Sequence, residues 1–193
     1  AGISTPKPDN GSILSINYFG TLAIANGLFP LLEKRRGSCV ITSSASITWV
    51  RPGSGGHISE LLCDCGDEER IVALANSFSP DAPYNMYTSS KIALARWARR
   101  VSIEWAIRGV RINVLAPGCV DTRLGQIPAG TDVNESFHFT IPPYYRSGGI
   151  IPPADMGQAC VFLLDESSRG FNGSVLYADA GQEAFYNTDK IYF

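Results

Sequence analysis

The 193-residue sequence contains few of the residues from which metal sites are built. Its only histidines are His57 and His138, and no second cysteine or histidine pair follows Cys63 and Cys65 at ligand spacing. The five cysteines are an odd number without the spacing of a disulfide framework, which indicates a reducing compartment. We therefore expect no metal and no disulfide scaffold.

Basic charge is also scarce. The net charge is −2, and the lysines and arginines are scattered along the chain, so the sequence lacks the basic surface that nucleic-acid binding needs. Arg96, Arg99 and Arg100 share one predicted helix, but a solvated helix face accounts for them. We expect no nucleic-acid partner.

The sequence supports neither a membrane span nor a secretion signal. Residues 12–32 carry no formal charge and are as long as a membrane span, but Ser15, Asn17 and Pro30 interrupt them. A buried helix is the better interpretation of this stretch. Because no basic-then-apolar segment opens the chain, we expect a cytoplasmic protein without a membrane partner.

The order of the apolar segments predicts an α/β fold. Short apolar runs are typical of buried parallel strands, and the longer segments between them have the length and end signals of helices. Strands that alternate with helices imply a parallel sheet, and the composition, 45% hydrophobic and 18% charged, suits one globular domain. We expect strands over 38–43, 110–115 and 174–179, and helices over 12–36, 87–108 and 153–165.

Two further segments interrupt this pattern. Residues 44–86 form a long insertion, in which an acidic start predicts a short helix over 67–75. Residues 123–152 are rich in aromatics, prolines and glycines, which suits a loop over an apolar substrate. We therefore interpret the chain as one domain, 1–193, with an insertion and a substrate loop.

A tyrosine and a lysine four residues apart open the helix predicted over 87–108. Tyr87 and Lys91 lie one turn apart on the same helical face. A nearby ammonium favours phenolate over phenol, so we expect the pKa of Tyr87 to fall from ~10 toward physiological pH. Such a phenol can act as a general acid or base, although an exposed pair of this kind also occurs on ordinary helices.

Other residues in the chain give the pair a context. The strand 38–43 ends in hydroxyl side chains at the edge where parallel sheets bind ligands. Asn17, Ser43, Tyr87, Lys91 and the run Pro117–Thr122, in this order, resemble the signature of the short-chain dehydrogenase/reductase family. The resemblance implies a Rossmann-type doubly wound parallel sheet, of which this chain would hold the C-terminal part.

Within that family, the chain is most similar to the 3α-hydroxysteroid dehydrogenase/carbonyl reductase type and to coniferyl-alcohol dehydrogenases. The run Ser-Ile-Asn-Tyr-Phe-Gly around Asn17 and the long insertion carry this similarity. The resemblance implies an NAD(P)-dependent oxidoreductase that interconverts a small apolar alcohol, of steroid or aryl type, and its carbonyl. A non-catalytic dinucleotide-sensing or interaction module of the same fold is the alternative.

The resemblance also implies catalytic roles for four residues. Tyr87 would donate or accept the proton, and Ser43 would hydrogen-bond the substrate oxygen. Lys91 would bind the nicotinamide ribose and lower the pKa of the tyrosine, and Asn17 would hold a water that links Lys91 to solvent. Ser44 is an alternative to Ser43 because both follow the strand, but the match of Ile-Thr-Ser to the family's usual Ile-Ser-Ser favours Ser43.

The cofactor implied by the resemblance is NAD or NADP, with NAD favoured. The family's glycine-rich first turn has no counterpart here, and Ala1-Gly2 matches the end of the family's Asn-Asn-Ala-Gly motif. We therefore expect the chain to begin where the fourth strand of the family's sheet ends, and a further segment to precede it. The residues expected to contact the cofactor, besides Tyr87 and Lys91, are Ala1, Gly2, Pro117, Gly118, Val120 and Thr122.

Family members assemble as homodimers or homotetramers, so the resemblance implies a homo-oligomer here as well. The family pairs through helices equivalent to 12–36 and 86–108 and through its last strand. Because the insertion 44–86 could cover the first of these surfaces, we expect a dimer through the C-terminal region.

Overall fold

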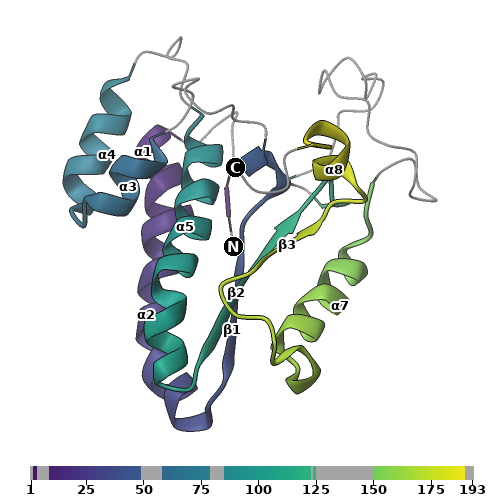
Figure 1. The fold of residues 1–193 in the computed structure, drawn as a ribbon. Helices are drawn as coiled ribbons and strands as arrows, with labels where there is room; N and C mark the ends of the chain where they lie inside the picture. Colours follow the sequence, from purple (N-terminus) through teal and green to yellow (C-terminus); the bar gives the residue numbers. More distant parts are fainter. Residues whose placement is uncertain are drawn as a thin grey trace.

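The structure is a computed structural model that describes residues 2–3, 9–48, 58–78, 85–122, 124 and 150–189. Within these residues, three parallel strands form one sheet in the order β1-β2-β3 (Figure 1). The strands are β1 Ser38–Thr42, β2 Arg111–Pro117 and β3 Val175–Ala178. The predicted α/β fold with a parallel sheet is therefore confirmed.

The central strand β2 forms the middle of the core. Its side chains from Ile112 to Ala116 are buried, as the continuous apolar run predicts for a strand covered on both faces. Thr42 pairs with Leu115, and Ala178 pairs with Pro117, so all three strands finish at the same edge of the sheet. Polar residues that follow the strands are thereby gathered at this edge.

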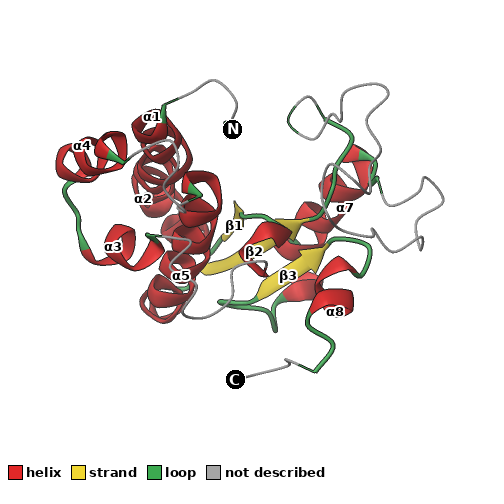
Figure 2. Cartoon of the chain, turned by 90° about the horizontal axis from the view of Figure 1, so that it is seen from above, coloured by secondary structure: helices red, strands yellow, loops and turns green. Residues whose placement is uncertain are grey.

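Helices cover both faces of the sheet, as the view from above shows (Figure 2). This doubly wound arrangement is the one that the sequence predicts. One layer contains α1 Asn10–Leu14, the π-helical turn Ser15–Phe19, α2 Gly20–Arg35 and α5 Met86–Ile107. The other contains α7 Pro153–Leu164 and the 3₁₀ turn Glu166–Ser168, with α8 Gln182–Tyr186 near the carboxyl ends of the strands.

The first helical run, Asn10–Arg35, is long and apolar enough to cross a membrane by length and composition. Core helices of other proteins pass the same test. Here Ile13, Leu14 and Phe29 are buried in the core, and Phe29 packs against Trp105 of α5 with ring centroids 4.6 Å apart. The interpretation of this run as a packed helix fits these contacts.

The insertion forms a 3₁₀ turn, Ala45–Thr48, and two helices, α3 Ser59–Asp64 and α4 Glu68–Ser77. α4 corresponds to the helix predicted over 67–75, and Asp67 caps it by accepting the backbone N–H of Arg70 at 3.0 Å. The short α3 was not predicted. α3 packs on α5 and α4 packs on α1, so the insertion covers part of both helices.

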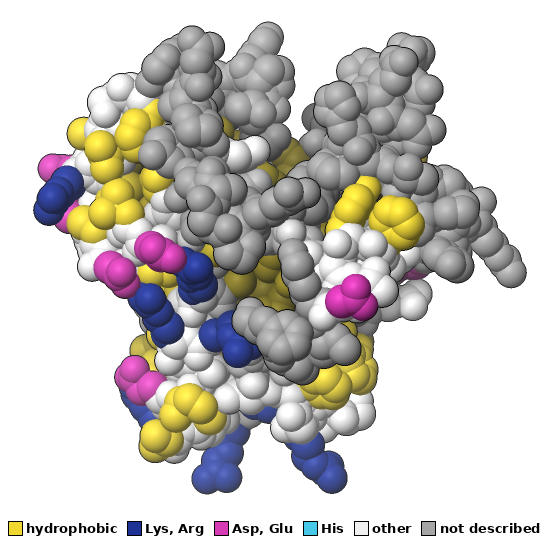
Figure 3. All heavy atoms as spheres, turned by 45° about the horizontal axis from the view of Figure 1, so that its top comes forward, with side chains coloured by type: hydrophobic (Ala, Val, Ile, Leu, Met, Phe, Trp, Pro, Cys, Tyr) yellow, Lys and Arg dark blue, Asp and Glu magenta, His cyan; other side chains and the backbone are white. Residues whose placement is uncertain are grey.

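Charged side chains lie interspersed among the described residues on the face shown in Figure 3, with acidic groups beside basic ones. The aromatic residues of the predicted substrate loop, such as Phe137 and Tyr144, lie outside the described residues. Ala1, one of the expected cofactor contacts, does so as well.

Candidate active site

Tyr87 and Lys91 lie in the first two turns of α5, at the edge of the sheet where the strands end. Asn85 caps the helix by accepting the backbone N–H of Thr88 at 2.9 Å. The Lys91 ammonium lies 5.6 Å from the centre of the Tyr87 ring, as the four-residue spacing predicts. Lys91 is buried, and its Nζ donates a hydrogen bond to the backbone carbonyl of Thr42, at the end of β1, at 3.1 Å.

Burial dominates the electrostatics of this pair. It lowers the pKa of Lys91 to about 8 and raises the pKa of Tyr87, while a hydrogen bond with Ser44 offsets part of that rise. The expected fall in the Tyr87 pKa is therefore wrong for this structure, because removing the phenol from water disfavours phenolate more than its neighbours favour it. Tyr87 is a neutral phenol at physiological pH, the form that can donate a proton.

The two serines after β1 differ in what they contact. The Ser43 hydroxyl is buried and donates to the backbone carbonyl of Lys91 at 2.8 Å, so it fastens β1 to α5. The half-buried Ser44 is the serine whose side chain interacts with the Tyr87 phenol, where it offsets part of the rise in the tyrosine pKa. Ser44 Oγ also accepts the backbone N–H of Ser46 at 3.2 Å, which leaves its own O–H free to donate. In this structure Ser44, the alternative, lies beside Tyr87, whereas the hydroxyl of Ser43 is used on the backbone of α5.

Asn17 lies in the π-helical turn Ser15–Phe19, a type of turn that often marks functional sites. Its buried side chain binds the backbone of Ile3 twice: Oδ1 accepts from the N–H and Nδ2 donates to the carbonyl, both at 2.8 Å. A Cβ on Gly2 would lie 3.4 Å from Asn17 Oδ1 and 3.7 Å from Lys91 Nζ. Asn17 thereby holds Gly2 beside the lysine, and both of its polar atoms already have backbone partners.

The turn after β2 approaches β3 closely. The N–H of Gly118 donates a hydrogen bond to the backbone carbonyl of Ala178 at 3.0 Å, and a Cβ on Gly118 would lie 2.7 Å from the Cα of Asp179. Only glycine fits so close to another backbone. Pro117 and Gly118 are thus held at the same sheet edge as Thr42.

Val120 and Thr122 continue from this turn. Val120 forms an isolated parallel bridge with Ile151, which ties the turn to the segment before α7. Thr122 is exposed, and its N–H donates to the Val120 carbonyl at 2.8 Å. Of the expected cofactor contacts, Gly2 lies beside Lys91, and Pro117 and Gly118 lie at the carboxyl end of β2, whereas Val120 and Thr122 lie farther along the chain.

Comparison with known proteins identifies the family. A family model described as enoyl-(acyl carrier protein) reductase matches residues 63–183, more than half of the chain. A crystal structure of 3-alpha-hydroxysteroid dehydrogenase from Pseudomonas sp. B-0831, complexed with NADH, superposes with a TM-score of 0.84 at 30% identity. That match covers 99% of this chain and 73% of the other. The chain belongs to the short-chain dehydrogenase/reductase family.

Two curated members of the short-chain dehydrogenase/reductase family illustrate the range of relatives. The 3-alpha-hydroxysteroid dehydrogenase/carbonyl reductase of Comamonas testosteroni is 26% identical over 187 residues, 95% of this chain and 70% of the relative. The inactive 2-(S)-hydroxypropyl-CoM dehydrogenase 2 of Xanthobacter autotrophicus is 27% identical over 176 residues, 90% of this chain and 64% of the relative. The chain thus spans about two thirds of the length of these relatives.

The alternation of side chains at the end of β1 could have identified Ser44 as the serine beside Tyr87. Successive side chains of a strand point to opposite faces. Ser43, two residues after the buried Ile41, follows the inward face, whereas Ser44 follows the face of the exposed Thr42. The contact between Asn17 and Ile3 had no such signal, because it joins residues 14 apart through a π-helical turn.

Proposed function

We propose that this protein is an NAD(P)-dependent oxidoreductase that interconverts an alcohol of steroid or aryl type and its carbonyl. The observation that carries the proposal is that the Tyr87 phenol lies beside both Ser44 and the buried Lys91 at the carboxyl ends of the strands. Family membership and the similarity to hydroxysteroid dehydrogenases support the reaction class.

The donor set of the site fits a nicotinamide dinucleotide, which supplies the hydride chemistry when bound. An ammonium has three N–H donors, and within the described part of the chain Lys91 uses one of them, on Thr42. The other donors suit the hydroxyls of a ribose. Gly2 and the Pro117-Gly118 turn lie at the same sheet edge. We assign binding of the cofactor to Gly2, Lys91, Pro117, Gly118, Val120 and Thr122, and favour NAD because the Pseudomonas relative was crystallised with NADH.

In this proposal Tyr87 is the residue that transfers the proton to and from the substrate oxygen. In the direction of carbonyl reduction, the neutral phenol gives its proton to the substrate oxygen while Ser44 donates a hydrogen bond to the same atom. The backbone N–H of Ser46 keeps Ser44 in the orientation that makes this possible. In the oxidation direction, Tyr87 first loses its proton to solvent, and the phenolate, stabilised by the Lys91 ammonium, then accepts the proton of the alcohol.

Lys91 and Asn17 support this chemistry in different ways. The Lys91 ammonium, 5.6 Å from the tyrosine ring, stabilises the phenolate as it forms. Asn17 positions Gly2 and Ile3 beside Lys91, and we assign it this positioning role in place of the water-holding role expected from the resemblance.

The test is a survey of substrates with the purified full-length protein. Oxidation of NADH and NADPH is followed at the nicotinamide absorbance with steroid ketones, aryl aldehydes and short polar 2-oxo acids. We expect turnover of an apolar ring-bearing carbonyl with a kcat on the order of 1–100 s⁻¹. Fastest turnover of the polar acids would contradict the substrate class, and no turnover of any carbonyl would contradict the enzyme activity.

A non-catalytic dinucleotide-sensing or interaction module is the second candidate. The similarity to an inactive dehydrogenase of Xanthobacter favours it. The same survey separates the two candidates, because a sensor would bind NADH, detected by its fluorescence, without oxidising it in the presence of any carbonyl.

Assembly and location are part of the proposal. We propose a homodimer through the C-terminal region, where Val161, Phe162, Leu164 and Phe171 are exposed on and beside α7. We also propose a cytoplasmic location, which the five free cysteines support.

A further inference from the structure

The insertion contacts both helices that carry site residues. On one side, α4 packs against α1, just before Asn17. The Gly11 N–H donates to Asn76 Oδ1 at 2.7 Å, and Asn10 Nδ2 donates to the Ala75 carbonyl at 3.1 Å. A Cβ on Gly11 would lie 2.7 Å from Val72 Cγ1, so side chains of α4 pack directly against the backbone of α1. The insertion is therefore anchored by two hydrogen bonds and close packing to α1, which leads directly into the turn that contains Asn17.

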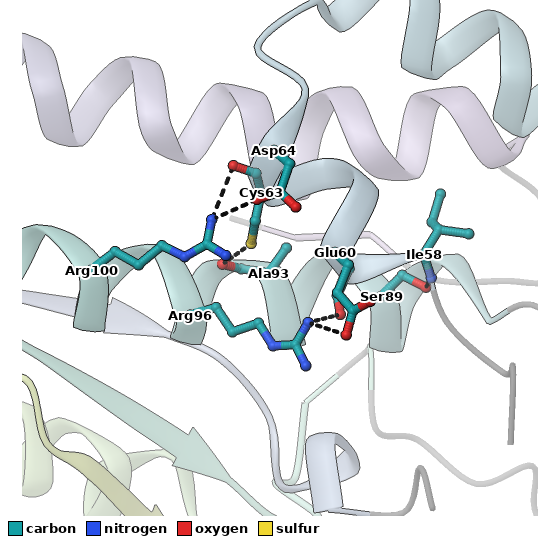
Figure 4. Close-up of polar contacts among 9 residues, drawn as sticks. Ile58, Glu60, Cys63, Asp64, Ser89, Ala93, Arg96 and Arg100 are labelled. Carbon is teal, nitrogen blue, oxygen red and sulfur yellow. Dashed lines mark hydrogen bonds and ion pairs between the residues drawn. The ribbon is translucent and has the colours of Figure 1, made fainter. Parts of the chain in front are cut away.

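On the other side, two arginines of α5 bind α3 (Figure 4). Arg96 Nη1 donates to Glu60 Oε1 at 3.4 Å, and Arg100 Nη1 donates to Asp64 Oδ1 at 3.0 Å. The two arginines are four residues apart on α5, and the two acidic residues are four apart on α3, so both ion pairs lie along the same line of contact between the helices. Such partly exposed pairs add little stability, but they fix the register of α3 along α5.

The insertion also contacts the segment of α5 from Tyr87 to Lys91, which we call the catalytic turn. The Ile58 N–H, at the start of α3, donates to Ser89 Oγ at 3.0 Å, and Figure 4 shows Ser89 directed at this N–H. Ser89 is fully buried, and its hydroxyl in turn donates to the carbonyl of Asn85, the N-cap of α5, at 2.7 Å. One hydroxyl therefore joins the insertion, the helix cap and the segment between Tyr87 and Lys91.

Tyr87 needs such a support because of its place in the helix. It is the second residue of α5, within the first turn, where backbone groups have few intrahelical partners and helices fray. A proton donor that moves by about 1 Å loses much of its catalytic effect. The geometry points to Ser89 as a positioning residue for Tyr87, with the α3–α4 insertion acting through Ser89 to hold the catalytic turn in place. This inference rests on the proposed function.

The first measurement is hydrogen exchange in the full-length protein with NADH present. We expect Ser89→Ala to increase exchange of the backbone amides of residues 88–91 by about five- to tenfold, because one buried hydrogen bond is lost. Ser102→Ala is the matched control, since Ser102 is buried in the same helix and its hydroxyl donates only to the Arg99 carbonyl among the described residues, at 2.8 Å. Its exchange over 88–91 should not change.

The second measurement is steady-state kinetics with the best carbonyl of the substrate survey. We expect Ser89→Ala to lower kcat about tenfold while KM for NADH and for the carbonyl changes less than about twofold. Arg96→Ala, which leaves Ser89 intact and alters a partly exposed side chain, should act in the same direction with a smaller effect. Ser102→Ala should leave kcat within about twofold of the wild type.

The results separate this inference from the proposed function. Wild-type kcat and unchanged exchange in Ser89→Ala would overturn the inference, and so would equal losses in Ser89→Ala and Ser102→Ala. If the wild-type protein turns over no carbonyl, the proposed function fails, and the exchange measurement alone decides whether Ser89 holds the turn. If Ser89→Ala does not fold, the exchange and kinetics of Arg96→Ala decide the question.

Discussion

The two ends of α5 have opposite surface patterns. At its N-terminal end, polar residues are buried: Thr88, Ser89, Ser90 and Lys91. At its C-terminal end, apolar residues are exposed, with Ile103 67% and Ile107 83% accessible. An ordinary helix of a globular protein places its apolar residues inside and its polar residues outside.

The difference is the one expected if the N-terminal end of α5 carries the proposed active site. Burying a lysine is unfavourable unless its interactions compensate, and burial here lowers the pKa of Lys91 to about 8. Exposed isoleucines, by contrast, are common on protein surfaces and have a small energetic effect. The buried lysine thus lowers the stability of the N-terminal end, as we expect for the proposed site, while the exposed isoleucines of the C-terminal end have little effect on the fold.

The largest effect is expected when the buried charge of Lys91, at the N-terminal end of α5, is removed. We expect Lys91→Met to lower kcat by about 10³-fold or more, because the ammonium no longer stabilises the phenolate. The same change should raise the free energy of unfolding at pH 7 by ~1–2 kcal/mol, because a buried charge is removed. Kinetics and urea denaturation measure the two effects, and a variant that is both inactive and clearly less stable would contradict the account.

The pH dependence of stability checks the same group. The pKa of Lys91 is about 8 in the folded protein and 10.5 for a free lysine. Between these values the unfolded chain binds more protons at Lys91, so the contribution of Lys91 to the free energy of unfolding rises with pH from about 8 to about 10. Burial raises the pKa of Tyr87 above 10.0, so the phenol does not titrate in this window. The thiols are common to both proteins, so the difference in the free energy of unfolding between the wild type and Lys91→Met should change with pH over this window, and a constant difference would contradict the account.

The two serines should give the next largest effects, and opposite ones. Ser44→Ala should lower kcat by about 10²-fold, because a hydrogen bond to the substrate oxygen is lost. Ser43→Ala should leave kcat within about threefold of wild type but lower the free energy of unfolding by ~1 kcal/mol, because the bond to the Lys91 carbonyl is lost. The reverse ranking of the two kcat values would restore Ser43 as the catalytic serine.

Sequence patterns predicted the strands because each is a short apolar run that ends in polar or turn residues. The runs 38–43, 110–115 and 174–179 correspond to β1, β2 and β3. The helix α3 was missed because it has six residues, too few to show a helical period. Its support comes instead from contacts with α5 that are distant in sequence, such as that between Ile58 and Ser89.

The sequence predicted that Tyr87 and Lys91 lie together at the strand ends, but it did not predict their electrostatics. The spacing of Tyr87 and Lys91 places them on one face, which any helix ensures. The pKa of each group depends on burial, which is decided by strands and loops that no local pattern specifies. The choice between Ser43 and Ser44 depended likewise on the exact residue at which β1 ends.

The smallest effect is expected at the exposed end of α5. Ile107→Lys should change the free energy of unfolding by less than about 0.5 kcal/mol. It should also leave the molar mass from light scattering unchanged if the protein pairs through its C-terminal region. Val161→Lys, on the exposed face of α7, should instead reduce the mass to that of a monomer. If Ile107→Lys alone dissociated the dimer, the proposed interface at α7 would be wrong, and an interface formed by α2 and α5 would replace it.

The central claim, that Tyr87 transfers the proton, is tested most directly by Tyr87→Phe. The variant removes one hydroxyl from a side chain whose ring stays in place, so circular dichroism and the thermal midpoint should match the wild type. The account predicts that kcat for NADH oxidation with the best carbonyl falls by about 10²–10⁴-fold. A kcat within about threefold of the wild type, in a folded full-length protein, would contradict it.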